Sequence, residues 1–357
     1  MTQLLLFIAG LIALTAGAEL LVRGASRLAL SFGLSPLVVG LTIVAFGTSA
    51  PEIAVAIKAA WAGQSDLTIG NVVGSNICNI LLILGLGALV APLAVAGQVV
   101  RQEVPVMIAA SALVVGLAVN GAIGRLEGAL LFALLAIYLV FIVRQSRRAS
   151  RAEQASYGEA PPDSRWDRHW ATQAALVAGG LILLVTGAEW LVEAAVYCAR
   201  WLGVDDLVIG LTVVAVGTSL PEIATSVMAA WRGERDLAVG NAVGSNIFNL
   251  LGCLGLGAMF SPDGLPVARA ALDFDLWVML AVAVACLPIF VARKRIARWE
   301  GVVFLAYYAA YVAYLVLDAS GSGMLKTFNL AMLGFFMPLT LLTLVVVTLR
   351  QRRRGTG

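Results

Sequence analysis

The segment GTSAPEIA at Gly47 to Ala54 occurs a second time, as GTSLPEIA, at Gly217 to Ala224. The two copies belong to a longer duplication, because sliding the chain by 170 residues also aligns GNVVGSNICN with GNAVGSNIFN and GAELLV with GAEWLV. From Leu37 to Gly87 most positions match their counterparts without a gap. A repeat of this length indicates one structural unit built twice along the chain.

Both copies lie in long apolar segments. The 357 residues are 61% hydrophobic and 13% charged, with a mean hydropathy of +0.93, whereas soluble domains are roughly 45 to 50% apolar. A membrane-spanning helix needs about 20 mainly apolar residues. We therefore predict an all-α polytopic membrane protein with eleven helices. They centre near residues 3–22, 36–60, 68–90, 104–120, 126–143, 172–192, 206–230, 238–260, 274–292, 300–317 and 326–349.

The repeat offset covers five predicted helices. Because five is odd, the second copy enters the membrane from the opposite side, and the halves are related by a pseudo-two-fold axis in the membrane plane. We predict a first five-helix repeat, a cytoplasmic linker, a second, inverted five-helix repeat, and an eleventh C-terminal helix with a basic tail. Their bounds are 1–143, 144–170, 171–317 and 318–357.

The basic residues predict the orientation, because they favour the cytoplasmic side of short loops. With the N-terminus outside and the C-terminus cytoplasmic, 19 of the 24 Lys and Arg residues fall on the cytoplasmic side of the inner membrane. The net charge of +3 gives no reason to expect a nucleic-acid partner. One chain carries both repeats, so we expect it to function in the lipid bilayer as a monomer.

Each copy of the motif places a carboxylate directly after a proline in an apolar segment. Inserting a charged side chain at the bilayer centre costs about 2.5 to 3.5 kcal/mol on insertion scales, so Glu52 and Glu222 are functional candidates. The proline before each acid removes a backbone hydrogen bond. We expect this to free the carbonyls of Ala45 and Ala215 for binding a cation, in a region where protein or a wet cavity must satisfy them.

The other polar side chains of the motifs share helical faces with one another. A threonine and a serine stand four and three residues before each acid, and the next helix carries a serine and an asparagine four apart. These residues are Thr48, Ser49, Ser75 and Asn79 in the first repeat and Thr218, Ser219, Ser245 and Asn249 in the second. Oxygen ligands suit hard cations, and Ca²⁺ takes about 6 to 8 of them. Helix packing beside glycines explains Asn71, Asn76, Asn241 and Asn246 at least as well as ion binding does.

Four scattered cysteines and a single histidine, His169, argue against a disulfide framework, a zinc site or a histidine-based triad. We expect neither an enzyme nor a cofactor.

The paired motifs resemble the two α-repeats of the sodium/calcium exchangers, within the calcium/cation antiporter superfamily and especially its prokaryotic members. The resemblance covers the first ten predicted helices and implies a secondary antiporter that exchanges Ca²⁺ for Na⁺ by alternating access. It implies that Glu52 and Glu222 coordinate Ca²⁺ with Thr48 and Thr218. It implies Na⁺ sites formed by Ser49, Ser75, Ser219 and Ser245 with the carbonyls of Ala45 and Ala215, and a central position lined by Asn79 and Asn249.

This sequence has Asn at two positions where some relatives carry Asp. Two carboxylates balance one Ca²⁺ or two Na⁺, and K⁺ coupling is disfavoured. The main alternative is a Ca²⁺/H⁺ antiporter, because paired buried carboxylates can also titrate. A passive cation channel and an intramembrane hydrolase are further alternatives. The first would show single-channel currents, and the second would show proteolysis that survives Glu52→Gln.

Overall fold

The computed structural model describes residues 2–32, 34–148, 169–203, 213 and 215–340, and most of these residues are helical. Within them, eight helices or continuous helix runs are long and apolar enough to cross a membrane. A ninth candidate is the pair Pro36–Thr48 and Ala50–Trp61, which bends by 45° at its break. The predicted class, an all-α polytopic membrane protein, is therefore confirmed. The eight are Thr2–Ala29, Ser65–Val90, Val99–Ala118, Arg125–Ser146, Trp170–Trp201, Arg235–Phe260, Ala271–Val291 and Arg298–Ala319.

The first half contains five helix runs that follow the predicted windows. Their elements are α1 (Thr2–Phe32); α2 (Pro36–Val39), the π-helix η1 (Gly40–Val44), α3 (Ala45–Thr48) and α4 (Ala50–Trp61); α5 (Ser65–Cys78), the π-helix η2 (Asn79–Ile83) and α6 (Leu84–Val90); the π-helix η3 (Val99–Glu103) and α7 (Val104–Ala118); and α8 (Arg125–Arg148). Helices α1 and α8 continue beyond the windows 3–22 and 126–143. The predicted windows end at the first arginine because it is charged. The helix itself can continue, because a long arginine side chain can reach the headgroups.

The second half repeats this order. Its elements are α10 (Trp170–Trp201); α12 (Ala215–Thr218) and α13 (Leu220–Arg232); α14 (Arg235–Ile247), the π-helix η6 (Phe248–Cys253) and α15 (Leu254–Phe260); the π-helix η7 (Ala271–Asp275) and α16 (Leu276–Arg293); α17 (Arg298–Ala319); and α18 (Leu325–Ala331) with the π-helix η8 (Met332–Phe336). Most of the predicted linker, the start of the seventh helix and the end of the eleventh helix lie outside the described residues.

Two short strand pairs join loops of one half to loops of the other. Strand β1 (Leu93–Ala94) pairs antiparallel with β4 (Arg295–Ile296), and Leu93 lies opposite Ile296. Strand β2 (Ala122–Ile123) pairs antiparallel with β3 (Leu265–Pro266), with Ile123 opposite Leu265. The loops of the two halves are therefore hydrogen-bonded to each other, and the halves interlock at two places.

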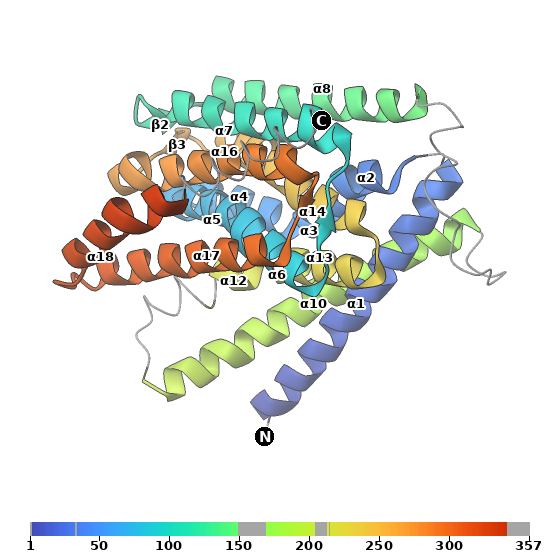
Figure 1. Ribbon diagram of the computed structural model, residues 1–357, viewed down its shortest axis with the longest axis horizontal. Helices are drawn as coiled ribbons and strands as arrows, with labels where there is room; N and C mark the ends of the chain where they lie inside the picture. The colour runs from blue at the N-terminus through green and yellow to red at the C-terminus, as the bar shows by residue number, and fades with distance from the viewer. Residues whose placement is uncertain (1, 33, 149–168, 204–212, 214, 341–357) are drawn as a thin grey trace, which may run out of the picture.

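Helices α1 and α10 cross each other along one side of the molecule, while α8 lies along the opposite side (Figure 1). The crossing is close because glycines face backbone. A Cβ on Gly17 would lie 2.8 Å from the Gly180 carbonyl oxygen, and one on Gly10 would lie 2.9 Å from that of Gly187. Small residues allow such backbone contacts between membrane helices. Since Gly10 and Gly17 correspond to Gly180 and Gly187 in the repeat, the seam is itself two-fold symmetric.

The α1–α10 pair also contacts the rest of the protein, chiefly α13. At one end an ion pair joins Glu19 of α1 to Arg232, the last residue of α13. This contact places the C-terminal part of α1 beside the C-terminal end of α13.

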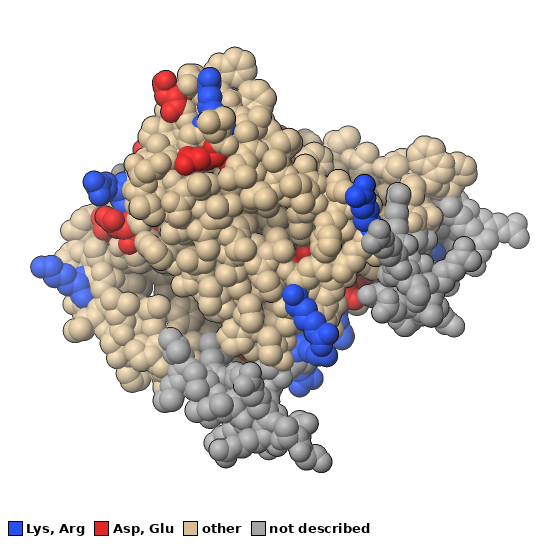
Figure 2. Space-filling view, turned by 90° about the horizontal axis from the view of Figure 1, so that it is seen from above, with Lys and Arg blue, Asp and Glu red and all other residues tan. Residues whose placement is uncertain are grey.

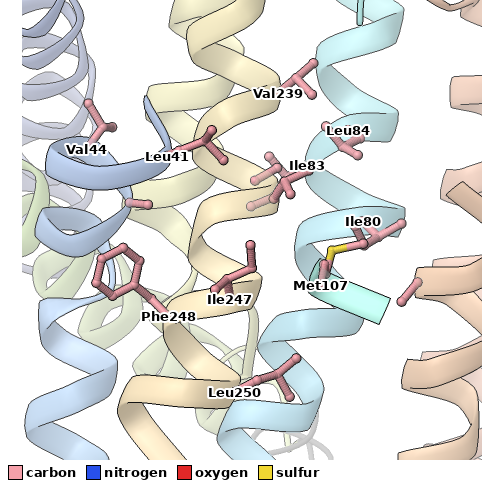
Figure 3. Close-up of a cluster of buried hydrophobic side chains, with 14 of the residues drawn as sticks. Leu41, Val44, Ile80, Ile83, Leu84, Met107, Val239, Ile247, Phe248 and Leu250 are labelled. Atoms are coloured by element: carbon pink, nitrogen blue, oxygen red, sulfur yellow. The ribbon is translucent and has the colours of Figure 1, made fainter. Parts of the chain in front are cut away.

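The α5 and α14 runs are the most deeply buried of the candidate spans and lie in the middle of the molecule. Apolar side chains from both halves interdigitate there (Figure 3). Leu41 and Ile83 from the first half and Val239 and Ile247 from the second are each completely buried. Figure 2 shows an outer surface that is largely free of charged side chains. An apolar exterior around a packed interior suits a protein surrounded by lipid.

Candidate cation site

The first repeat breaks its second helix at the GTSAPE motif. Helix α3 ends at Thr48, and Ser49 has φ −83° and ψ 4° before α4 resumes with Pro51 in its first turn. Glu52 also lies in that first turn. Negative charge is favoured at a helix N-terminus, so the break holds the acid in a favourable field.

One detail of the prediction was wrong. The Ala45 carbonyl is not freed by the proline, because it accepts a hydrogen bond from the Ser49 amide at 3.0 Å. A proline removes the bond to the residue four positions earlier, which is Gly47 for Pro51. A carbonyl oxygen has two lone pairs, so Ala45 keeps one that is available to a cation.

The second repeat has the same break with one difference. Ser219 has φ −92° and ψ 6° between α12 and α13, and Glu222 lies in the first turn of α13. The Ser219 amide donates to the Val216 carbonyl at 3.1 Å. This i→i−3 bond has no counterpart in the first repeat, where the Ser49 amide donates to Ala45.

The neighbouring helix of each repeat changes to a π-helix at the predicted asparagine. Asn79 is the first residue of η2, and Asn249 is the second residue of η6. A π-turn widens the helix locally and occurs frequently at functional sites. No sequence feature other than the asparagines themselves indicates these turns.

The predicted ligands come together in the interior of the protein. Glu52 and Glu222 are each 1% exposed, and the two carboxylates lie close enough for their charges to interact. The other predicted ligand side chains of known placement are buried or half-buried. They are Ala45, Thr48, Ser49, Ser75, Asn79, Thr218, Ser219, Ser245 and Asn249.

Hydrogen bonds between the repeats link these side chains. The Ser49 hydroxyl donates to Glu222 Oε1 at 3.3 Å, so a serine of the first repeat touches the acid of the second. The Ser219 hydroxyl lies 3.5 Å from that of Ser75. The two halves therefore build one shared site rather than two separate ones.

The asparagines that helix packing explains at least as well as ion binding also contact the predicted ligands or one another. The Asn79 side-chain amide donates to Asn246 Oδ1 at 2.9 Å, and the Asn246 amide donates to the Asn76 carbonyl at 3.3 Å. Asn71 contacts Thr218 and Asn241 contacts Thr48, each in the opposite half of the chain. Their recurrence at equal positions of the two repeats was the sequence signal for these contacts.

Several oxygens of the predicted ligands are buried without a hydrogen-bond partner. They are Glu52 Oε2, Glu222 Oε2, Asn79 Oδ1 and Ser245 Oγ. Buried polar atoms almost always have partners, and each exception needs an explanation such as a bound ion or water. Carboxylate, amide and hydroxyl oxygens with spare lone pairs are the ligands that hard cations prefer. Among the described residues, His, Cys, Asp and Glu form no group of three or more that could hold a metal.

A polytopic helical membrane protein with acidic and hydroxyl oxygens converging in its interior is a cation transporter by class. The sodium/calcium exchanger protein family model matches residues 2–144 and 172–317. The chain belongs to this family. Its members are transporters and not enzymes, and the exchanged ions are substrates rather than cofactors.

Individual relatives agree. The chain is 40% identical to CaxA of Alkalimonas amylolytica, over 85% of this chain and 95% of that one. It is 34% identical to the sodium/calcium exchanger MaX1 of Methanosarcina acetivorans, over 87% of this chain and 97% of that one. The solved structure of the sodium–calcium exchanger NCX_Mj, soaked with 10 mM Na⁺ and no Ca²⁺, superposes with a TM-score of 0.73 at 32% identity. That match covers 87% of this chain and 98% of NCX_Mj.

Proposed function

We propose that this multi-pass membrane protein is a secondary antiporter that exchanges Ca²⁺ for Na⁺ across the inner membrane. Its family establishes a cation antiporter of the exchanger type. The observation that carries the choice of ions is the pair of buried carboxylates, one from each repeat, with unpartnered oxygens beside unpartnered amide and hydroxyl oxygens. Two carboxylates balance one Ca²⁺ or two Na⁺, so either load leaves the site neutral.

The ligands divide by chemistry. Ca²⁺ is coordinated by Glu52 and Glu222 with the hydroxyls of Thr48 and Thr218. The Na⁺ ions use Ser49, Ser75, Ser219 and Ser245 with the carbonyls of Ala45 and Ala215, and Asn79 and Asn249 line the centre. Both loads depend on the charge of the same two carboxylates, so binding of the two ions is mutually exclusive, and this couples their fluxes.

Alternating access moves the α1–α10 pair relative to the remaining helices. The pair is held together by its own glycine seam, so it can shift as one body. The seam also supports the inverted repeat, because Gly10 faces Gly187 and Gly17 faces Gly180. Residue numbers therefore increase along α1 where they decrease along α10. Two helices that occupy equivalent positions in the repeats therefore run antiparallel.

The orientation has an outside N-terminus and a cytoplasmic C-terminus. The predicted topology places the C-terminal ends of α1 and α13 on the cytoplasmic side, and the Glu19–Arg232 ion pair supports a common side for both. The repeats cover 1–143 and 171–317, separated by the linker 144–170 and followed by the eleventh helix and tail at 318–357. One chain holds the complete ligand set and functions as a monomer.

The test measures uptake of radioactive calcium by proteoliposomes that contain the purified protein. Gradients of Na⁺, K⁺ and pH are imposed in turn, and we expect only the Na⁺ gradient to drive uptake. Uptake driven by a pH gradient without Na⁺ would instead establish the Ca²⁺/H⁺ antiporter. Substitution of either Glu52 or Glu222 by Gln is expected to abolish gradient-driven uptake.

Glu103 offers a matched control for these substitutions. It is another fully buried acid, but its carboxylate accepts hydrogen bonds from Tyr138 at 2.6 Å and Gln98 at 2.9 Å, neither of which is a predicted ligand. We expect Glu103→Gln to transport Ca²⁺ like the unmodified protein. Wild-type-like transport by either Glu52→Gln or Glu222→Gln would remove that acid from the site.

A further inference from the structure

Two threonine–asparagine contacts cross the pseudo-two-fold axis at the cation site. The Thr48 hydroxyl lies 3.2 Å from Oδ1 of Asn241, and the Thr218 hydroxyl lies 3.3 Å from Oδ1 of Asn71. Each threonine is one repeat length from the other, and so is each asparagine. The same contact therefore occurs twice, each time between a threonine of one repeat and an asparagine of the other.

A hydroxyl that binds a cation must turn a lone pair toward the ion and direct its proton elsewhere. Thr48 is completely buried, so the acceptor for its proton comes from the protein. Thr48 has two alternative acceptors in its own helix, the carbonyls of Val44 at 3.1 Å and Ala45 at 3.4 Å. Donation to Asn241 instead leaves the Ala45 oxygen unencumbered by the threonine.

The orientation of the Asn241 amide follows from its other neighbours. Its Nδ2 lies 3.4 Å from the Glu222 carbonyl oxygen, which can only accept a hydrogen bond, so the nitrogen faces that side. The nitrogen also donates to the Ser226 hydroxyl at 2.9 Å, while that hydroxyl donates to the Ala238 carbonyl at 3.5 Å. Oδ1 therefore points at Thr48 and can only accept its proton.

The two copies of this arrangement are not equally anchored. Ala56 stands in the first repeat where Ser226 stands in the second. Correspondingly, Nδ2 of Asn71 is buried without a hydrogen-bond partner. Ser226 is thus an orienting group that only one of the two asparagines possesses.

We propose that Asn241 and Asn71 are positioning residues of the cation site, each accepting the hydroxyl proton of the threonine opposite so that its lone pairs face the ion. Ser226 fixes Asn241 in the accepting orientation. The role assigned to Thr48 and Thr218 rests on the proposed function. The asparagines act through the threonines and do not contact the ion.

The test is a set of double-mutant cycles, read out as Ca²⁺ binding to the purified protein by titration calorimetry. Thr48→Val and Asn241→Ala are each expected to weaken binding by about five-fold, as the loss of one hydrogen bond does. Because Asn241 acts through the Thr48 hydroxyl, the double variant should bind no more weakly than Thr48→Val alone. The pair Thr218→Val and Asn71→Ala should behave in the same way.

The two-fold symmetry provides the control. Asn241→Ala combined with Thr218→Val removes groups from different contacts, so the two losses should multiply. The same holds for Asn71→Ala with Thr48→Val. A general structural effect of removing an asparagine would appear equally in both backgrounds, and multiplicative losses in all four combinations would overturn the proposal.

Ser226→Ala tests the same role with a smaller change, in case the asparagine variants misfold. The protein already has alanine at the equivalent position of the first repeat, Ala56. Ser226→Ala should weaken Ca²⁺ binding in the wild-type background and have no further effect in Thr48→Val. An equal effect in both backgrounds would contradict the orienting role. Ca²⁺ binding can be measured whether or not the protein exchanges ions. A protein that bound Ca²⁺ without Na⁺-driven transport would refute the proposed antiport, and the binding cycles would still test the role of the asparagines. Absence of both Ca²⁺ and Na⁺ binding would overturn both.

Discussion

The Ser49 hydroxyl of the first repeat donates a hydrogen bond to Glu222 Oε1 of the second repeat over 3.3 Å. The equivalent serine, Ser219, does not mirror this contact and lies 3.5 Å from Ser75 instead. The asparagines show the same asymmetry, since Asn79 donates to Asn246 while Asn249 accepts from the Cys253 thiol at 3.5 Å. Two nearly identical motifs thus have different hydrogen-bond partners in this structure.

This asymmetry predicts unequal effects of two matching substitutions. Ser49→Ala removes both a proposed Na⁺ ligand and the donor to a buried carboxylate, and a hydrogen bond to a charged group contributes about 1.5 to 3 kcal/mol. We expect Na⁺ affinity to fall by about ten-fold or more for Ser49→Ala, and by less for Ser219→Ala. Na⁺ titration of the purified variants measures this. Equal losses would mean that the Ser49–Glu222 contact does not contribute.

The glycine seam between α1 and α10 predicts opposite effects at two adjacent glycines. A Cβ at Gly180 would lie 2.7 Å from the Leu21 amide nitrogen and 2.8 Å from the Gly17 carbonyl oxygen, and backbone cannot yield easily. Gly180→Ala should therefore destabilise the protein by about 1 to 3 kcal/mol, as overpacking does. Melting in detergent measures the change.

Gly179 is the control, because a Cβ there meets nothing within 4 Å. Alanine is preferred over glycine inside helices by about 1 kcal/mol, so Gly179→Ala should melt at the same or a higher temperature. Similar destabilisation of both variants would show that the close approach of α1 and α10 is not the cause.

The sequence predicted those features that depend on residues near one another in the chain. The apolar windows placed the described helices, and the repeated motifs identified Glu52 and Glu222, which are both buried in the interior. The helix break also followed locally, because Pro51 and Pro221 cannot donate to the preceding turn. The duplication indicated that the two motifs would meet.

Partners across the repeats could not be predicted, because they depend on how helices cross. Spacing placed Thr48 on the face of Glu52, yet its side-chain partner is Asn241, which lies 193 residues away in the chain. The Ala45 carbonyl was misjudged because proline affects the residue four positions earlier, which is Gly47. The unequal bonding of Ser49 and Ser219 had no signal in two motifs that differ by one residue.

Partial burial of Glu234, in the turn between α13 and α14, predicts a pH dependence of stability. Burial and repulsion from Asp236 raise the pKa of the Glu234 carboxyl above its usual 4.5. The folded protein therefore favours the protonated form, and stability falls as pH rises from below 4.5 through the raised value. We expect Glu234→Gln to melt like the wild type near about pH 4 and above it near about pH 8. If the variant and the wild type melted at the same temperature at both pH values, the raised pKa of Glu234 would be contradicted.

Helix α10 packs closely against the glycine of each motif, Gly47 and Gly217. A Cβ at Gly217 would lie 2.3 Å from Val192 Cγ2 of α10, and a Cβ at Gly47 would lie 2.6 Å from Leu181 Cδ1. Valine is β-branched and stiff at χ1, whereas the far end of a leucine side chain can rotate away. We expect Gly217→Ala to slow cation transport more than Gly47→Ala does, because it forces α10 away from the site.

A second substitution separates this contact from a general loss of fold. Val192→Ala removes the colliding methyl groups, so it should restore transport to Gly217→Ala while having no restoring effect on Gly47→Ala. Initial uptake rates in proteoliposomes, corrected for the amount of reconstituted protein, measure both pairs. If Val192→Ala fails to rescue Gly217→Ala, the glycine is needed for a reason other than the approach of α10. Rescue confined to that one pair would show that the transport rate depends on the fit of the α1–α10 pair against the broken helix of the second repeat.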